Sequence, residues 1–205
     1  FMRELCYRDG AYQWHGIIRQ DRPHVGLGDF CAYYGSVGEF LELSEEEWFD
    51  SMLEGCRRIG RNLNDTRGLF HSFKDCRQVM AALFADLDDA MDPKWEICFE
   101  LRINRARYIR IYADVLVITE DKVFSLEFKM KDKIEPEEIC QAAKYTEYLE
   151  VLFGPSYDVI PALVLTRAHD LYRYERLDDR GGEIPVCSGD MLFNLFDEYI
   201  GFLEK

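Results

Sequence analysis

Two acids and a lysine stand close together in the segment that follows residue 110. Asp114 interrupts a run of apolar residues, and Glu127 lies two positions before Lys129 inside a second such run. Carboxylates can hold a divalent metal ion, and a lysine beside them can stabilise the charge that develops on a phosphate. These residue types and this order are what magnesium-dependent hydrolysis of a phosphodiester requires.

The spacing of Glu127 and Lys129 is weak evidence by itself, because an acid stands two residues before a lysine three times in the chain. The other two acids, Asp92 and Glu120, lie in polar stretches that are typical of loops. Only Glu127 and Lys129 lie inside a predicted strand. The alternative, a salt-bridge pair on one strand face, contributes only about 0–1 kcal/mol and leaves the position of Asp114 unexplained.

The two apolar runs predict a hairpin, since only four residues separate them. If Ile118 pairs with Val123, Asp114 lies directly opposite Glu127, and Lys129 lies on the same face as Glu127. Directly opposed residues have Cβ atoms about 4.5–5.5 Å apart, and like charges there repel each other. We therefore expect a compensating Mg²⁺ or Mn²⁺ ion held by Asp114 and Glu127.

Glu100 is the third candidate ligand, and it comes from an earlier strand. Apolar and polar residues alternate over residues 96–103, which predicts a half-buried strand with Glu100 on its polar face. If a three-residue loop follows, Ile103 pairs with Arg107, and Glu100 shares the face of Asp114. A two-residue loop would reverse that face, so both alternatives stay open at this point.

Helix signals flank the hairpin. A capping box at Ser44 and Glu47 opens one helix, and Pro136 at a first helical position opens another. The predicted elements are helices over about 44–59, 66–88, 136–153 and 190–204, a buried strand over 159–166, and a short edge strand over 184–187. A strand, a helix and a strand in succession indicate a parallel crossover, so the expected fold is α/β, a mixed sheet between helices.

The motifs resemble those of the PD-(D/E)XK nuclease superfamily, whose restriction-endonuclease-like fold is the expected architecture. Asp114 stands at the family's first aspartate, with Ala113 where the family has proline, and residues 127–129 match the second half of the signature. Gln141 and Tyr145 are similar to the Q-x-x-x-Y element of the RecB-like branch. The resemblance implies that Asp114, Glu127 and Glu100 bind metal, that these acids and Lys129 are catalytic, and that Gln141 and Tyr145 contact nucleic acid.

A longer stretch, from about Tyr33 to Thr166, is similar to the nuclease-like domain that precedes the helicase in a family of bacterial helicase-fusion proteins. It covers about two thirds of the chain. The shared features are Phe40-Leu41, Phe99-Glu100, Arg110, the two metal motifs and residues 162–166. No G-x-x-x-x-G-K-[ST] motif is present, so we do not expect ATP use, although a helicase or another protein partner is implied.

Composition is compatible with one domain over residues 1–205, with a core at about 31–170, an N-terminal extension over 1–30 and a final strand and helix over 184–205. With 205 residues and 48% hydrophobic content, the chain can bury a substantial core. Seven cysteines without a C-x-x-C spacing favour reduced core thiols in a cytoplasmic protein. Four isolated histidines show no metal-ligand spacing and are expected at the surface or at helix caps. Apolar runs are too short to span a bilayer, so no membrane partner is expected.

Net charge is the main argument against a nucleic-acid substrate, because it is −14 and phosphate binding relies on lysine and arginine. The basic residues nevertheless concentrate near the acids. Arg107, Arg110 and Lys131 are therefore predicted to bind nucleic acid, with DNA favoured over RNA, although a solvated strand face explains any single arginine equally well. The competing function is a catalytically silent nuclease-fold module that binds nucleic acid or a protein partner.

Overall fold

The structure is a computed structural model that describes residues 23–64, 66–103, 111–177 and 182–202. The strands are β1 (Tyr33–Ser36), β2 (Glu96–Arg102), β3 (Tyr112–Ile118), β4 (Lys122–Lys129), β5 (Asp158–Leu165), β6 (Tyr172–Leu177) and β7 (Gly182–Ser188). The α-helices are α2 (Val37–Glu42), α3 (Glu45–Ile59), α4 (Thr66–Leu87), α5 (Pro136–Phe153) and α6 (Leu192–Ile200). Short 3₁₀ turns η1 (Val25–Asp29), η2 (Asp88–Ala90) and η3 (Gly189–Met191) complete the described elements.

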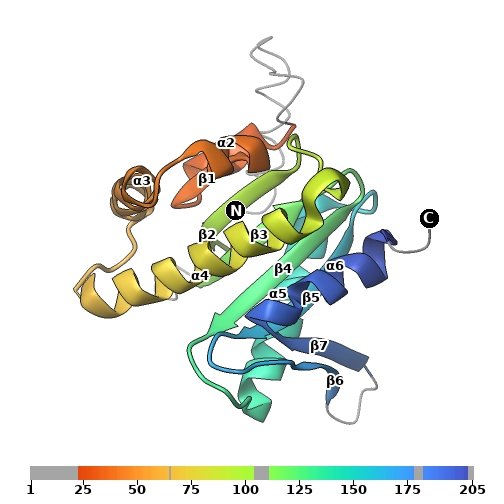
Figure 1. Ribbon diagram of the computed structural model, residues 1–205. Coiled ribbons are helices and arrows are strands. Elements are labelled where there is room, and N and C mark those ends of the chain that lie inside the picture. Colours follow the sequence, from red (N-terminus) through yellow and green to blue (C-terminus); the bar gives the residue numbers. More distant parts are fainter. Residues whose placement is uncertain (1–22, 65, 104–110, 178–181, 203–205) are drawn as a thin grey trace.

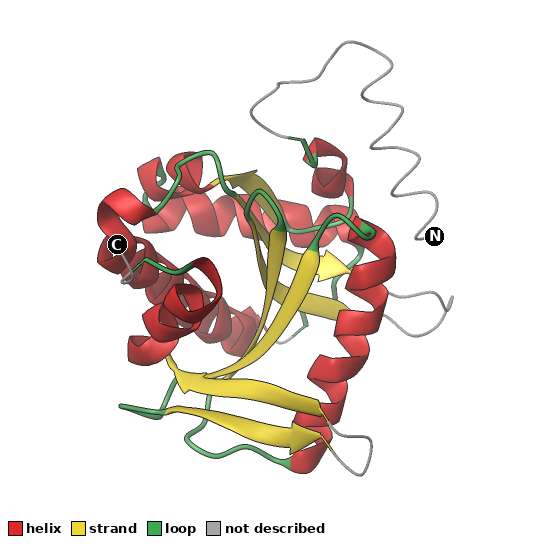
Figure 2. Ribbon diagram, turned by 90° about the vertical axis from the view of Figure 1, so that its right-hand side faces the viewer, coloured by secondary structure: helices red, strands yellow, loops and turns green. Residues whose placement is uncertain are grey.

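The seven strands form one mixed sheet in the order β1-β2-β3-β4-β5-β7-β6. The β4–β5 and β5–β7 pairs are parallel, and the other neighbours are antiparallel. Helices α2, α3, α4 and α6 cover one face, while α5 covers the other (Figures 1 and 2). The predicted α/β class, a mixed sheet between helices, is therefore confirmed.

Local signals explain the helix boundaries. Ser44 and Glu47 form the predicted capping box at the start of α3, which ends at Gly60 in the left-handed conformation with φ of 72°. Pro136 begins α5, where a missing backbone N–H costs nothing. The helices predicted over residues 44–59, 66–88 and 136–153 are confirmed with at most small changes at their ends.

Aromatic side chains fill the thicker layer, beneath the four helices. Trp48 and Phe40 pack at right angles, and each also contacts Phe99 of β2. Farther along the sheet, Phe124 of β4 stacks on Phe196 of α6 with ring centroids 4.0 Å apart. These contacts bury large rings, which contribute most per residue to the hydrophobic stabilisation of the core.

Four details of the predicted topology are wrong. Residues 96–101 are all buried, because both faces of β2 are covered. Ile103 donates a backbone hydrogen bond to Ile111, not to Arg107, so the connection to β3 is longer than three residues. The strand near residue 185 pairs on both sides, and the edge belongs to β6, a strand that was not predicted. The last helix begins at Leu192 and ends at Ile200.

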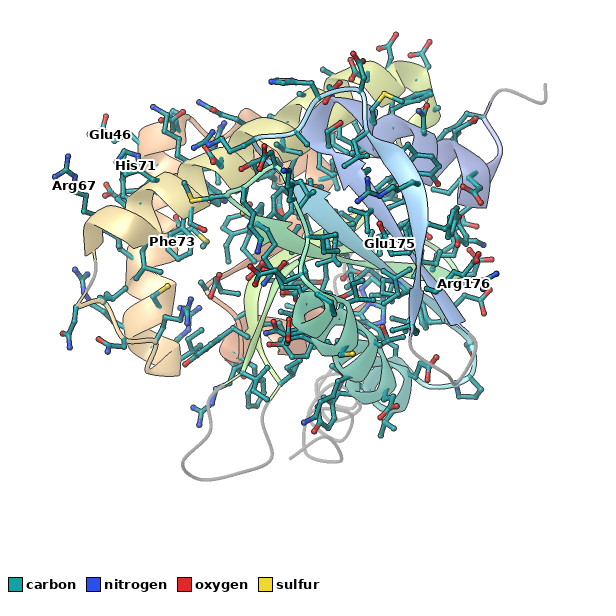
Figure 3. The ribbon with its side chains drawn as sticks, turned by 90° about the horizontal axis from the view of Figure 1, so that it is seen from below. Glu46, Arg67, His71, Phe73, Glu175 and Arg176 are labelled. Carbon is teal, nitrogen blue, oxygen red and sulfur yellow. The ribbon has the colours of Figure 1, made fainter. Side chains whose placement is uncertain are left out.

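Charged side chains lie at two opposite sides of the molecule (Figure 3). Glu46, Arg67 and His71 lie at the outer end of the α3–α4 pair, and Glu175 and Arg176 lie on the edge strand β6 at the opposite side (Figure 3). Charged side chains along an exposed edge discourage pairing with another chain. In the part of the chain that the structure describes, helices are too short or too polar to cross a membrane.

Candidate functional site

Three acids from neighbouring strands lie side by side across the middle of the sheet. Phe99 pairs with Val115 and Leu101 with Ala113, which places Glu100 across from Asp114. On the other side, Val115 pairs with Leu126, so Asp114 lies one position beyond that pair, beside Glu127. We call Glu100, Asp114 and Glu127 the carboxylate row.

The predicted hairpin register is confirmed from Ile118 with Val123 through Val115 with Leu126. At the next position the regular ladder gives way to a side-chain contact. The backbone N–H of Phe128 donates a 2.8 Å hydrogen bond to Oδ2 of Asp114. This bond holds the Asp114 carboxylate against the end of β4, next to the side chain of Glu127.

The backbone at Glu100 departs from regular strand geometry, with φ of 54°. Before it, Phe99 packs beneath α3 and α4, and after it Leu101 packs in the cluster that includes α5. The predicted alternation therefore reverses at Glu100, because a residue with positive φ breaks the pleat. Such a conformation costs about 1–3 kcal/mol in a non-glycine residue and is concentrated at functional sites.

Burial raises the pKa of every member of the carboxylate row. It is the largest cause for Glu100, whose pKa rises to about 8, with repulsion from Asp114 adding to it. It also raises the pKa of Asp114, against the Phe128 hydrogen bond, and raises the pKa of Glu127 well above its usual range. Without a cation each of the three acids therefore holds its proton to a higher pH than an ordinary carboxyl group does.

Lys129 lies on the same strand as Glu127 and is half-buried. Its charge opposes the rise in pKa of both Asp114 and Glu127. Phe124, Leu126 and Phe128 all pack on the other face of β4, as the alternation predicted. The structure therefore brings Asp114, Glu127 and Lys129 together.

Two oxygens of the row are buried and accept no hydrogen bond from the described residues: Oε2 of Glu100 and Oε1 of Glu127. The first lies 2.8 Å from Nε of Arg61, a protein cation, whereas the second is suited to bind an added cation. A buried, unpaired carboxylate oxygen is costly unless it binds a proton or a metal. The described residues contain no group of three or more His, Cys, Asp and Glu placed to hold a metal. A pair is sufficient for Mg²⁺, which usually binds one or two carboxylates and completes its shell with water and phosphate.

Arg61 is a member of the site that the sequence analysis missed. Its Nε lies 2.8 Å from Oε2 of Glu100, and its guanidinium carbon lies 4.5 Å from the centre of the Tyr112 ring. Arg61 follows the helix-ending Gly60 in the sequence, and that glycine is the only sequence signal that could have drawn attention to it. Glu100 is thus paired with a protein cation, and its role as a metal ligand stays a prediction.

Gln141 and Tyr145 share one face of α5, as their spacing predicted, and the Gln141 side-chain amide donates a hydrogen bond to the Tyr145 hydroxyl. Tyr145 is buried while Gln141 is exposed. Burial, opposed by the Gln141 bond and aided by the carboxylate row, raises the pKa of Tyr145 to about 12. The two residues therefore link the site to the surface of α5.

The structure describes one of the three basic residues that were predicted to bind nucleic acid. Nζ of Lys131 lies 2.8 Å from Glu138 and 3.6 Å from Glu135, so nearby acids already engage its charge. Arg107 and Arg110 lie outside the described residues.

The prediction for the cysteines needs one correction, and the prediction for His24 is confirmed. Cys140 is exposed, although Cys31, Cys56, Cys76, Cys98 and Cys187 are buried as expected. His24 lies at a helix cap, as expected, because it is the N-cap residue of η1. Its backbone N–H donates a hydrogen bond to the carboxylate of the buried Glu96, and its Nδ1 lies 2.7 Å from the same carboxylate.

Comparison with known proteins adds no assignment. No protein-family model matches the chain, and no curated protein matches it at a significant level. The chemistry of the site therefore has to be argued from its own residues.

Proposed function

We propose that this protein is a divalent-metal-dependent nuclease that hydrolyses phosphodiester bonds of DNA, with RNA as a possible second substrate. The observation that carries the proposal is a pair of carboxylates on adjacent strands, the buried Glu127 and the half-buried Asp114, with Lys129 next to them. Its support from sequence is the resemblance to PD-(D/E)XK nucleases, in which the same residue types stand in the same order.

Asp114 and Glu127 would hold one Mg²⁺ or Mn²⁺ ion. The Phe128 N–H fixes the Asp114 carboxylate, and the unpaired Oε1 of Glu127 gives the ion a second oxygen. When bound, the metal would lower the pKa of a water molecule and neutralise charge on the phosphate. The protein then contributes carboxylate ligands that are already held in place, so they need little rearrangement when the metal ion binds.

Lys129 would position the attacking water and stabilise the charge that develops on the phosphate oxygens. Its half-buried position favours this role, because a charge acts more strongly where water is partly excluded. Gln141, exposed on α5 and bonded to Tyr145, would orient the nucleic-acid strand.

The acidic balance of the chain bears on how a strand reaches the site. A net charge of −14 repels nucleic acid at long range, so a basic protein partner, such as a helicase, would deliver the strand. The competing proposal, a catalytically silent module that binds nucleic acid or a protein, has the same fold and differs in its chemistry.

Cleavage of end-labelled single-stranded and nicked DNA in Mn²⁺ separates the two proposals. The wild type should cut, and both Asp114→Asn and Lys129→Ala should lose activity by a factor on the order of 100 or more. Lys129→Ala should keep its Mn²⁺ affinity, because a nearby cation opposes metal binding. Asp132→Asn and Lys133→Ala are matched controls, since both side chains are exposed in the loop after β4.

The result that would favour the silent module is a wild type that cuts neither DNA nor RNA between pH 6 and 9. The assay should be repeated after addition of a helicase from the same organism. An acidic nuclease that needs a partner to bring the nucleic-acid strand to its site would become active in that mixture.

A further inference from the structure

Arg61 is a partly buried cation to which the proposed nuclease chemistry gives no role. Its Nε contacts Oε2 of Glu100 at 2.8 Å, and only 28% of its side chain is exposed. The guanidinium also lies over the Tyr112 ring, at 4.5 Å from the centroid. An arginine that stacks on a ring and pairs with a buried carboxylate is held in one place.

The backbone around Arg61 is fixed as firmly as its side chain. The Arg61 N–H donates a 2.9 Å hydrogen bond to the carbonyl of Cys56, in the last turn of α3. Farther back in that helix, Gly55 packs so closely that a Cβ there would lie 1.8 Å from the carbonyl oxygen of Ala32. The end of α3 is therefore set against the sheet, and Arg61 with it.

The position of Arg61 matters because it contacts Glu100, the member of the carboxylate row farthest from Glu127, on the other side of Asp114. Two acids that face each other across β2 and β3 form a second place where a cation would be stabilised. Arg61 supplies a positive charge there, and its charge also reaches Asp114, where it opposes the rise in pKa. A second metal ion would have to bind beside this fixed guanidinium.

Charge balance leads to the same conclusion. When all three acids of the row are ionised, Arg61 and Lys129 neutralise two of them and leave one net negative charge. One divalent ion and one phosphodiester, with its single negative charge, then make the site neutral. A second divalent ion would leave two uncompensated positive charges in a largely buried place, which is costly.

We infer that Arg61 takes the place of a second metal ion: it neutralises Glu100 and limits the site to one divalent ion, held by Asp114 and Glu127. Glu100 then acts as the anchor of Arg61 and not as a metal ligand. The inference rests on the proposed metal-dependent function, and it specifies the number of ions.

Titration calorimetry with Mn²⁺ alone tests the inference through stoichiometry, without any need for activity. The wild type should bind one ion, and Arg61→Gln should bind a second, because Glu100 and Asp114 are then uncompensated. Arg61→Lys should return the number to one. Arg57→Gln removes an exposed arginine from the last turn of the same helix, so it is the matched control and should bind one ion.

Glu100→Gln supplies a second measurement in case Arg61→Gln does not fold. The inference expects that variant to keep one bound ion, with affinity reduced by no more than about tenfold, whereas Asp114→Asn should lose binding. Circular dichroism of each variant checks the fold.

The outcomes separate this inference from the proposed function. Two ions of similar affinity in the wild type, or loss of the ion in Glu100→Gln, would overturn the role of Arg61 and leave a metal-dependent nuclease in place. A single ion in Arg61→Gln, when that variant is folded, would also overturn it. No Mn²⁺ binding in the wild type would overturn both.

Discussion

The backbone N–H of Phe128 donates a 2.8 Å hydrogen bond to Oδ2 of Asp114, so the strand that carries Glu127 also orients the neighbouring carboxylate. A carboxylate held by a backbone donor cannot turn away from a like charge beside it. The arrangement therefore keeps two acids together at a cost to the stability of the metal-free protein, which is typical of sites that are built for a ligand. Four predictions follow from the energetics of this site and its support.

Glu127→Gln should stabilise the protein when no metal is present. The substitution keeps the shape of a buried side chain and removes both the burial cost and the repulsion from Asp114. Urea unfolding at pH 8 with a chelator should give a free energy of unfolding higher by about 1–2 kcal/mol. Glu147→Gln, at an exposed position of α5, is the control and should change it little. A loss of stability in Glu127→Gln would show that the charge has a protein partner.

The stability of the metal-free protein should fall as the pH rises from about 5 to about 8. Burial raises the pKa of Glu100 from 4.5 to about 8, so in this window the folded protein holds a proton that the unfolded chain has released. The free energy of unfolding then decreases with pH, by up to a few kcal/mol for this group. Above pH 8 the contribution is constant.

Glu100→Gln checks the origin of this pH dependence, because an amide does not titrate. Denaturant unfolding of the variant between pH 5 and 9 should give a flatter curve than that of the wild type. Parallel curves for the two proteins would assign the proton to another group, since the pKa values of Asp114 and Glu127 are raised in the same direction.

Mn²⁺ should stabilise the folded protein, and more at pH 8 than at pH 6. A ligand that binds only the native state adds about 2.7 kcal/mol at a hundredfold excess over its Kd. Protons on the carboxylate row compete with the metal, so the increase in Tm should shrink as the pH falls. Melting curves with and without chelator at the two pH values measure it, and unchanged curves at saturating Mg²⁺ and Mn²⁺ would argue for a non-catalytic protein.

Gly55→Ala should destabilise the protein by more than about 3 kcal/mol. A Cβ at this position would lie 1.8 Å from the carbonyl oxygen of Ala32, and backbone atoms cannot move aside as a flexible side chain could. Gly28→Ala is the control, because the nearest atoms to its Cβ would be 3.8 Å away. Thermal unfolding of both variants compares them, and equal Tm values would mean that α3 can shift away from the sheet.

The hairpin was predictable from the sequence because its register depends on local information. Four polar residues between two apolar runs leave few ways to pair Ile118 with Val123, and that pairing brings Asp114 beside Glu127. The capping residues Ser44 and Pro136 likewise act within one helical turn. These features needed no knowledge of the rest of the chain.

Glu100 and Arg61 were beyond the reach of that reasoning. The alternation of apolar and polar residues around Glu100 looked regular. The positive φ of Glu100 nevertheless places Phe99 and Leu101 on opposite faces of the sheet, and no residue type in the sequence indicates this. Arg61 and Glu100 are far apart in the sequence, and they come into contact only because α3 packs on the sheet. The edge strand β6 was missed because its charged residues suit solvent more than a core.

The central claim is that Asp114 and Glu127 hold a divalent metal ion, and diffraction from crystals soaked in Mn²⁺ tests it most directly. The account predicts one anomalous peak at about 2.1 Å from a carboxylate oxygen of each residue. Crystals of Asp114→Asn, treated in the same way, should lack that peak. Saturating Mn²⁺ with no peak between Asp114 and Glu127, or with the peak at another place, would contradict the account.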